Sequence, residues 1–179
     1  MHYTFSVLHT FTSGSDGAKP DSLTFDSKGN LFGTTANGGS GECGGTGCGT
    51  VFELSPQSGG GWSESVLYAF CSLSGCADGE EPASGPLAID AAGNLYGTTI
   101  GGGSYSDCDG GTCGVVFRLD TAEKETVLHS FTGGSDGAYP LGSVILDRAG
   151  NLYGTAASGG DLKCQPKYGG CGTLFRIAP

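Results

Sequence analysis

Eight cysteines are the residues whose types and spacing point most directly to chemistry in this sequence. They fall into four close pairs: Cys43/Cys48, Cys71/Cys76, Cys108/Cys113 and Cys164/Cys171. An even number of cysteines in local pairs indicates disulfides and an oxidising compartment. Zinc is the alternative, but structural zinc sites more often use pairs two residues apart, and no histidine lies near these pairs. The sequence therefore predicts four disulfides, each between neighbouring cysteines.

Acidic and imidazole side chains offer a second set of candidates. Three aspartates recur before a glycine: Asp16, Asp78 and Asp136. Because calcium takes several oxygen ligands, these carboxylates are candidates for a calcium site. The alternative is an Asp-Gly turn with a solvated carboxylate, and the spacing is less dense than in an Asp-x-Asp-x-Asp loop. His9 and His129 occupy a position that Tyr68 takes in the middle of the chain, and this exchange favours packing over metal binding or acid–base chemistry.

Two short patterns resemble catalytic or cofactor motifs but lack the required context. Residues 133–137 match Gly-x-Ser-x-Gly, whereas a nucleophile elbow needs a strand-to-helix turn. Residues 39–44 match Gly-x-Gly-x-x-Gly, whereas a dinucleotide site needs a helix after the glycines. With 36 glycines in 179 residues, such matches arise by chance. We assign no catalytic residue and no cofactor.

The segments that must position these residues repeat three times, with a period of roughly 60 residues. The copies cover approximately residues 6–56, 64–121 and 125–179. Each copy contains V-L-x-x-F, an alternating run that ends in Asp, then G-N-L-aromatic-G-T, and finally a G-T-V-F-type run. Leu23 and Phe25 illustrate the alternation, which is the period of a strand. No segment shows the 3.6-residue period of a helix, so we expect essentially no helix.

The turn between the first two strands of each unit has the form D-x-x-G-N. Its aspartate can accept backbone N–H bonds, and its glycine supplies the positive φ that closes a hairpin. The glycines are Gly29, Gly93 and Gly150. Four antiparallel strands per unit, repeated radially, describe a β-propeller. We therefore predict one all-β domain over residues 1–179, a propeller-like array of three four-stranded antiparallel blades.

The chain also resembles a known family. The run D-x-x-G-N-L-Y-G-T-T, a glycine-rich loop and G-T-V-F-x-L are similar to the GloVer tandem repeat, in three copies over almost the whole chain. The resemblance implies a bacterial surface or secreted protein. It implies no catalytic residues.

The phase of the repeat predicts unmatched strands at the two ends. Residues 7–11 would be an outer strand without a blade, and residues 172–177 a third strand without an outer neighbour. Because an unpaired edge is a template for another strand, we expect residues 7–11 to complete the last blade of the same or a neighbouring chain. Pairing between chains gives a ring or a filament; otherwise the chain is a piece of a longer array. The predicted edge residues are Val7, Leu8, Phe11, Thr173, Phe175 and Ile177.

Composition excludes several classes of partner. A net charge of −10 argues against nucleic-acid binding, which needs a basic surface. No apolar run approaches 18 residues, so we expect no membrane insertion. Residues 1–12 lack the charged and apolar regions of a signal peptide; we expect either that one was removed or that the chain is an excised piece.

Together these features predict a non-enzymatic extracellular or cell-surface structural protein that forms a homo-oligomer or filament. A surface binding module for a glycan or a protein is the alternative, because loops often carry binding sites. Aromatic residues in or near the loops could stack on sugars: Trp62, Tyr105, Tyr139 and Tyr168. A hydrolase or lyase on a propeller scaffold is a third possibility, and it would require paired carboxylates near the axis.

Overall fold

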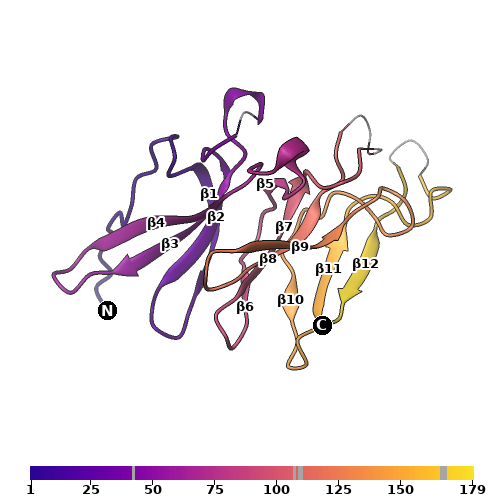
Figure 1. Cartoon of the computed structure of the whole chain (residues 1–179). Helices are drawn as coiled ribbons and strands as arrows, with labels where there is room; N and C mark the ends of the chain where they lie inside the picture. Colours follow the sequence, from indigo (N-terminus) through magenta and orange to yellow (C-terminus); the bar gives the residue numbers. More distant parts are fainter. Residues whose placement is uncertain (42, 107, 109–110, 166–168) are drawn as a thin grey trace.

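The fold is known from a computed structural model that describes residues 1–41, 43–106, 108, 111–165 and 169–179. Strands dominate it, and the helical elements of the described residues are two short 3-10 turns, η1 (Cys43–Gly45) and η2 (Ser74–Cys76). Three antiparallel sheets follow one another along the chain and lie side by side (Figure 1). The prediction of an all-β chain with essentially no helix is therefore confirmed.

Sheet 1 has four strands whose order in space is their order in the sequence. They are β1 (Ala18–Phe25), β2 (Leu31–Asn37), β3 (Thr50–Pro56) and β4 (Trp62–Ala69). The last strand contains the V-L of the second copy's V-L-x-x-F run. Sheet 1 is thus completed by a strand from the following copy, as the repeat phase predicts.

Sheet 2 repeats this arrangement with a divided first strand. Its strands are β5 (Glu80–Pro82), β6 (Ala88–Ile89), β7 (Leu95–Gly101), β8 (Val115–Leu119) and β9 (Glu125–Ser130). Both β5 and β6 pair with β7, so together they take the place of β1. The β1 strand has an irregularity between Pro20 and Leu23, the region where its counterpart is interrupted.

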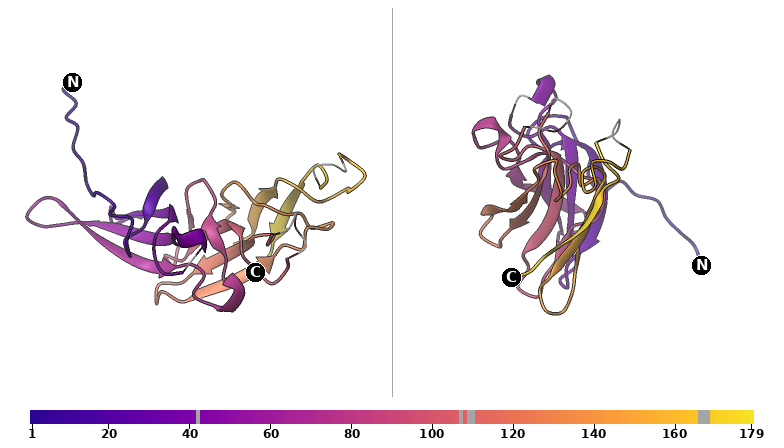
Figure 2. Two further views of the ribbon diagram at one scale, coloured as in Figure 1. Left: turned by 90° about the horizontal axis from the view of Figure 1, so that it is seen from above. Right: turned by 90° about the vertical axis from the view of Figure 1, so that its right-hand side faces the viewer.

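Sheet 3 has three strands: β10 (Ile145–Leu146), β11 (Leu152–Ala156) and β12 (Thr173–Ile177). In the described part of the chain no fourth strand pairs with β12. Residues 1–10 form no strand, and the N-terminal segment projects away from the sheets (Figure 2). The expected strand at residues 7–11 is therefore not formed, and these residues do not pair with β12 of the same chain. The described sheets do not close on themselves, so the structure shows antiparallel sheets and leaves the propeller a proposal.

The D-x-x-G-N turns have the predicted construction. In the first copy, Asp26 Oδ1 accepts hydrogen bonds from Lys28 N at 2.8 Å and from Asn30 N at 2.9 Å. Aspartates 90 and 147 accept equivalent bonds in the other copies. The φ angles of the three turn glycines are 90°, 89° and 85° for Gly29, Gly93 and Gly150.

Two of the hydrophobic cores lie between neighbouring sheets. One contains Val51 and Phe70 from the end of sheet 1 together with Leu87 and Phe117 from sheet 2. The other contains Val116 and residues of sheet 3. Packing of sheet against sheet is therefore what holds successive copies together. None of the described residues belongs to a helix long and apolar enough to cross a membrane.

Candidate functional site

Four disulfides join the cysteines, each within one of the local pairs expected from the sequence. They are Cys43–Cys48, Cys71–Cys76, Cys108–Cys113 and Cys164–Cys171. The first and third pairs precede β3 and β8, and the fourth precedes β12. The second lies in the connection after β4. A short bridged loop of this kind is stabilised by roughly 2 kcal/mol in the chain-entropy account.

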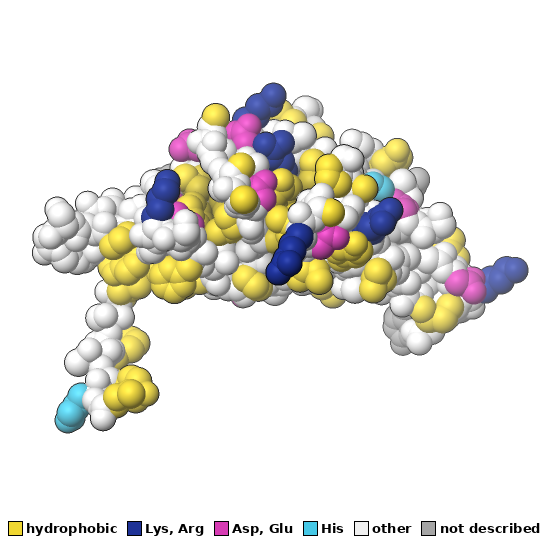
Figure 3. Space-filling view, turned by 90° about the horizontal axis from the view of Figure 1, so that it is seen from below, with side chains coloured by type: hydrophobic (Ala, Val, Ile, Leu, Met, Phe, Trp, Pro, Cys, Tyr) yellow, Lys and Arg dark blue, Asp and Glu magenta, His cyan; other side chains and the backbone are white. Residues whose placement is uncertain are grey.

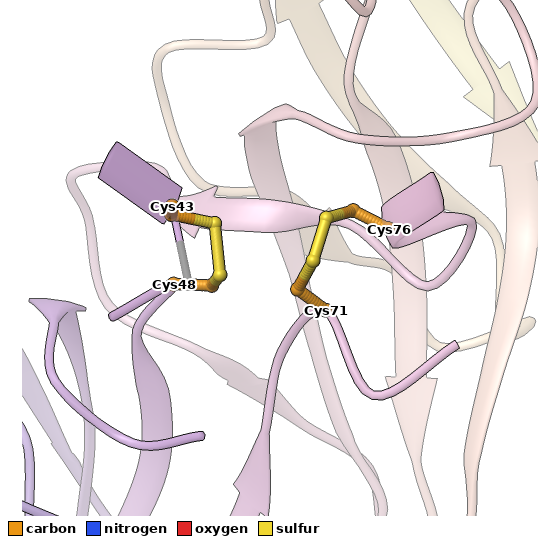
Figure 4. A group of neighbouring side chains, drawn as sticks. All are labelled: Cys43, Cys48, Cys71 and Cys76. Carbon is orange, nitrogen blue, oxygen red and sulfur yellow. A yellow bond between two sulfur atoms is a disulfide. The ribbon is translucent and has the colours of Figure 1, made fainter. Parts of the chain in front are cut away.

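Two of these disulfides lie next to each other at the junction between sheets 1 and 2 (Figure 4). The Sγ atoms of Cys43, Cys48, Cys71 and Cys76 are all within 4.8 Å of one another. Cys48 is buried, and the other three are half-buried. Sequence spacing could not predict this cluster, because it depends on how the connection after β4 packs against the loop before β3.

The three recurring aspartates close loops between successive sheets. Asp78 is fully buried, and its carboxylate accepts bonds from Ser72 N at 2.8 Å, Leu73 N at 3.1 Å and Tyr68 Oη at 2.8 Å. Asp16 and Asp136 accept similar bonds from the residues four positions before them. Internal donors thus surround carboxylates that were candidates for calcium, and the three do not converge on one point among the described residues.

The position shared by His9, Tyr68 and His129 is explained by these aspartates. Tyr68 bonds to Asp78, His129 Nε2 lies 3.0 Å from Asp136 Oδ2, and His9 Nε2 lies 3.5 Å from Asp16 Oδ2. Either a histidine or a tyrosine suits this position, because the ring of each can donate one hydrogen bond toward the aspartate. Sequence reasoning treated the two sets of residues separately. The seven-residue spacing that His9–Asp16 shares with His129–Asp136 was a signal that could have joined them, although Tyr68 and Asp78 are ten residues apart.

An aromatic contact accompanies each aspartate. Edge-on ring pairs join Phe11 to Phe52, Phe70 to Phe117 and Phe131 to Phe175, with centroids 5.1, 5.0 and 5.3 Å apart. In the second and third pairs, the first phenylalanine directly follows the end of one sheet and packs on the next sheet. Phe11 makes the same contact with sheet 1, although residues before it belong to no sheet.

Two half-buried acids lie on the outer strands. Burial and, secondarily, the nearby Asp78 charge raise the pKa of Glu125 to about 7. Burial also raises the pKa of Glu64, while His9 opposes the change. Glu64 and Glu125 hold equivalent places in β4 and β9, opposite Leu54 and Leu119.

The repeat reveals which surfaces lack a neighbour in the single chain. Val51 in β3 and Val116 in β8 have no exposed surface, whereas Leu174, at the same position in β12, is 78% exposed. Leu87 and Val144, directly before β6 and β10, are 4% and 2% exposed, whereas Leu23, at the same position of the repeat in β1, is 47% exposed. Each exposed side chain is the counterpart of one that a neighbouring sheet covers.

Backbone conformation in the first sheet also matches the internal junctions. Glu81 N donates to Cys48 O at 2.9 Å and Tyr139 N to Cys113 O at 3.0 Å. Both donor residues have a φ of 54°, and Lys19, at their position in sheet 1, has a φ of 55°. A positive φ is unusual for residues other than glycine, so Lys19 holds the junction conformation without a preceding sheet.

Hollows lie at both ends of the row of sheets. One of about 310 Å³ runs beside β12 and is lined by His129, Asp136 and residues 173–177. Another of about 560 Å³ lies beside residues 13–19 and 37–41 of sheet 1. Figure 3 shows hydrophobic side chains on the surface seen from below and along the projecting N-terminal segment, where Tyr3 and Phe5 are exposed.

The loop aromatics have different surroundings. Trp62 packs against the core of sheet 1, and Tyr139 Oη donates to Cys108 O at 2.8 Å. Tyr105 is 46% exposed. Tyr168, also a candidate for stacking on sugars, lies outside the described residues.

Comparison with known proteins agrees with the repeated motifs. A search of curated proteins finds no match. The family model described as the Gloeobacter/Verrucomicrobia repeat matches residues 2–179. Because this match covers nearly the whole sequence, the chain belongs to the Gloeobacter/Verrucomicrobia repeat family.

Proposed function

We propose that this chain is a non-enzymatic extracellular structural protein whose copies associate through sheet edges into a ring or a filament. The observation that carries the proposal is the exposed edge of β12. In sheets 1 and 2 the corresponding strands are paired on both sides, and the pairing strand contains V-L-x-x-F residues. Residues 7–11 have the same sequence pattern and lie outside the sheets.

The internal sheets define how the two segments would pair. Val51 lies opposite Tyr68 and Val116 opposite His129, and the same register would bring Leu174 opposite His9 of another copy. Phe52 and Phe117 lie opposite valines in the same way, and Phe175 would then lie opposite Val7. The backbone N–H of Phe11 would then donate to Gly172 O, as Phe70 N donates to Gly49 O at 3.0 Å.

Packing of sheet on sheet would support this strand pairing. Val51 and Leu87 lie in one core, as do Val116 and Val144. The equivalent contact between copies joins Leu174 of one chain to Leu23 of the next. Each sheet is then a blade, and the contacts between chains repeat those within a chain. Burial of an apolar side chain of this size contributes about 1.5–3 kcal/mol.

The disulfides support an extracellular location, because such bonds persist mainly in oxidising compartments. A formal charge of −10 would also keep a repetitive surface soluble.

The test is the native mass of the purified chain, measured by light scattering and native mass spectrometry. We expect particles larger than the 17.9 kDa chain, and we expect Leu174→Asp to dissociate them. Leu73→Asp is the matched control, because Leu73 is 54% exposed at a junction inside the chain. A monomeric wild-type chain would contradict the proposal.

A binding module for a glycan or a protein is the second candidate. The exposed ring of Tyr105 favours it, because an exposed aromatic side chain can stack on a sugar. Binding to a glycan array that is lost in Tyr105→Ala would support this function. An array without any bound sugar would count against the glycan form of it.

A further inference from the structure

We propose that the reduced chain binds one Zn²⁺ ion through Cys43, Cys48, Cys71 and Cys76. This metal site is independent of the proposed assembly, and it would exist only when both disulfides are reduced. The four Sγ atoms lie within 4.8 Å of one another. In a tetrahedral zinc tetrathiolate, Zn–S bonds of about 2.3 Å place the sulfurs about 3.8 Å apart. Within each pair the two sulfurs are bonded and would have to move apart after reduction, whereas the sulfurs of different pairs already lie within 4.8 Å of one another.

The loop of the first cysteine pair is held by hydrogen bonds that do not depend on its disulfide. Gly38 N donates to Thr46 O at 2.8 Å, and Gly49 N donates to Gly38 O at 3.0 Å. These two bonds fix the chain on both sides of Cys48. We therefore expect this loop to keep its position when the disulfide is reduced.

The second loop has an independent support as well. The buried carboxylate of Asp78 accepts bonds from Ser72 N and Leu73 N, which directly follow Cys71. Gly79 N donates to Cys76 O at 2.8 Å. Reduction would thus leave four thiols close together on two braced loops, which lowers the conformational cost of gathering them around an ion.

The surroundings of the cluster also suit a cation. Gly41 has a φ of 103°, and a Cβ at this position would lie 2.6 Å from Cys48 Sγ, so only glycine lets its loop pass so close to the sulfurs. Glu80 Oε2 lies 3.1 Å from Cys43 Sγ and adds negative charge beside the site. The half-buried cysteines leave a path from solvent, while Cys48 is shielded.

The chemistry balances with a phosphine as the reductant. Each disulfide, one phosphine and one water give two thiols and one phosphine oxide, so two phosphines open the cluster. Zinc binding then releases four protons as four thiolates form. In the reverse direction, two molecules of a small-molecule disulfide oxidise the four thiolates to two protein disulfides, yield four small thiols after proton uptake, and release Zn²⁺. The redox conditions and the supply of zinc therefore determine whether this junction between sheets 1 and 2 contains two disulfides or a metal ion.

The test uses the full chain, reduced with a phosphine under anaerobic conditions and titrated with Co²⁺ as a spectroscopic probe. We expect one equivalent to give the visible bands of a tetrahedral tetrathiolate site, and Zn²⁺ to displace it. The Cys71→Ser/Cys76→Ser variant should lose these bands. The Cys108→Ser/Cys113→Ser variant is the matched control, because this pair lies outside the cluster, and it should keep them.

Circular dichroism of the same samples shows whether the reduced chain keeps its strands. A reduced chain that remains folded without binding one metal overturns the proposal. So does a chain that unfolds on reduction and does not regain its strands with Zn²⁺. Equal Co²⁺ binding by the two double variants would also overturn it. Native mass plays no part in these outcomes, so the assembly proposal stands or fails separately.

Discussion

Single aspartate side chains determine the turns from which each sheet is built. Hydrogen bonds from Asn151 hold the pKa of Asp147 below its usual 3.8, with further bonds from Tyr153 and Ala149. A carboxyl whose pKa is lowered by folding stabilises the folded chain above about pH 4, and this stabilisation is lost as the pH falls. The ionised form is thus part of the turn.

The need for a positive φ at the turn glycine can be tested separately from steric clashes with neighbouring residues. Gly29 has a φ of 90°, and a Cβ at this position would meet nothing within 4 Å. We expect Gly29→Val to destabilise the chain by more than the roughly 1–2 kcal/mol of a left-handed residue, because valine is β-branched. Thermal melting should show a drop of about 2–4 °C for each kcal/mol.

Gly59→Val is the control for this effect. A Cβ at Gly59 also meets nothing within 4 Å, and its φ is not in the left-handed region. Equal melting temperatures for the two variants would show that the turn does not need glycine.

The half-buried acid of β9 predicts an unusual dependence on pH. Because burial raises the pKa of Glu125 to about 7 from its usual 4.5, folding favours the protonated form. Its contribution to stability is complete below pH 4.5 and is lost as the pH rises through about 7. Glu125→Gln should therefore stabilise the chain more at pH 8 than at pH 4, as measured by urea unfolding.

Glu123→Gln serves as the reference, because Glu123 is exposed in the neighbouring turn. We expect this variant to have the same effect on stability at both pH values. A Glu125→Gln effect that does not change with pH would mean that folding does not change the pKa of Glu125.

At the scale of elements, the junction between sheets is the unit of stability. Phe70 follows the end of β4, has no exposed surface and packs against Phe117 of β8. We expect Phe70→Ala to reduce the free energy of unfolding by about 3–5 kcal/mol, because it leaves a cavity between two sheets. Chemical denaturation would measure the loss.

Phe25→Ala is the matched comparison at an exposed position, since Phe25 is 65% exposed on β1. Its effect should be much smaller. Similar losses for the two variants would mean that the core between sheets does not hold the copies together.

The strands, turns and disulfide pairs could be predicted because each depends on residues close in the sequence. The alternation of Leu23 and Phe25 predicts a strand whichever sheet comes next, and the D-x-x-G-N pattern contains its own hydrogen bonds. The convergence of Cys43 with Cys71 depends instead on packing between sheets. The spacing of cysteines contains no information about that packing.

The sequence pattern also did not predict that the first strand of sheet 2 is divided. The alternating run before Asp90 predicts one strand, which corresponds to β6, whereas the structure also has β5, and both pair with β7. Glu81, inside β5, has a φ of 54° and its N–H donates to Cys48 O, so a contact with the preceding sheet determines the local backbone. Tertiary contacts override the local pattern at this point.

At the scale of the whole molecule, the same junction occurs twice inside the chain and is half-formed at each end. Phe11 is already packed on Phe52, and Lys19 already has the φ of its counterparts. Leu174 and Leu23 are exposed at positions that are buried elsewhere. A contact between copies would therefore require little rearrangement of either end.

Removal of residues 1–8 tests this contact with little disturbance to the single chain. These residues are exposed, whereas His9 and Phe11, which contact Asp16 and Phe52, are retained. We expect the shortened chain to lose its assembly, because Val7, Leu8 and the residues that precede them are gone and most of the edge of β12 stays open. Light scattering should give the mass of one chain, and added salt should not restore the particle.

A synthetic peptide of residues 1–11 completes the experiment. Supplied to the shortened chain, it should bind beside β12 by adding a strand, since main-chain hydrogen bonds provide the affinity and alternate side chains the register. Substitution of Val7 by proline in the peptide should abolish binding, because Val7 is predicted to lie opposite Phe175 within the ladder. If the shortened chain keeps the native mass, or if the proline peptide binds equally well, another segment covers the edge of β12.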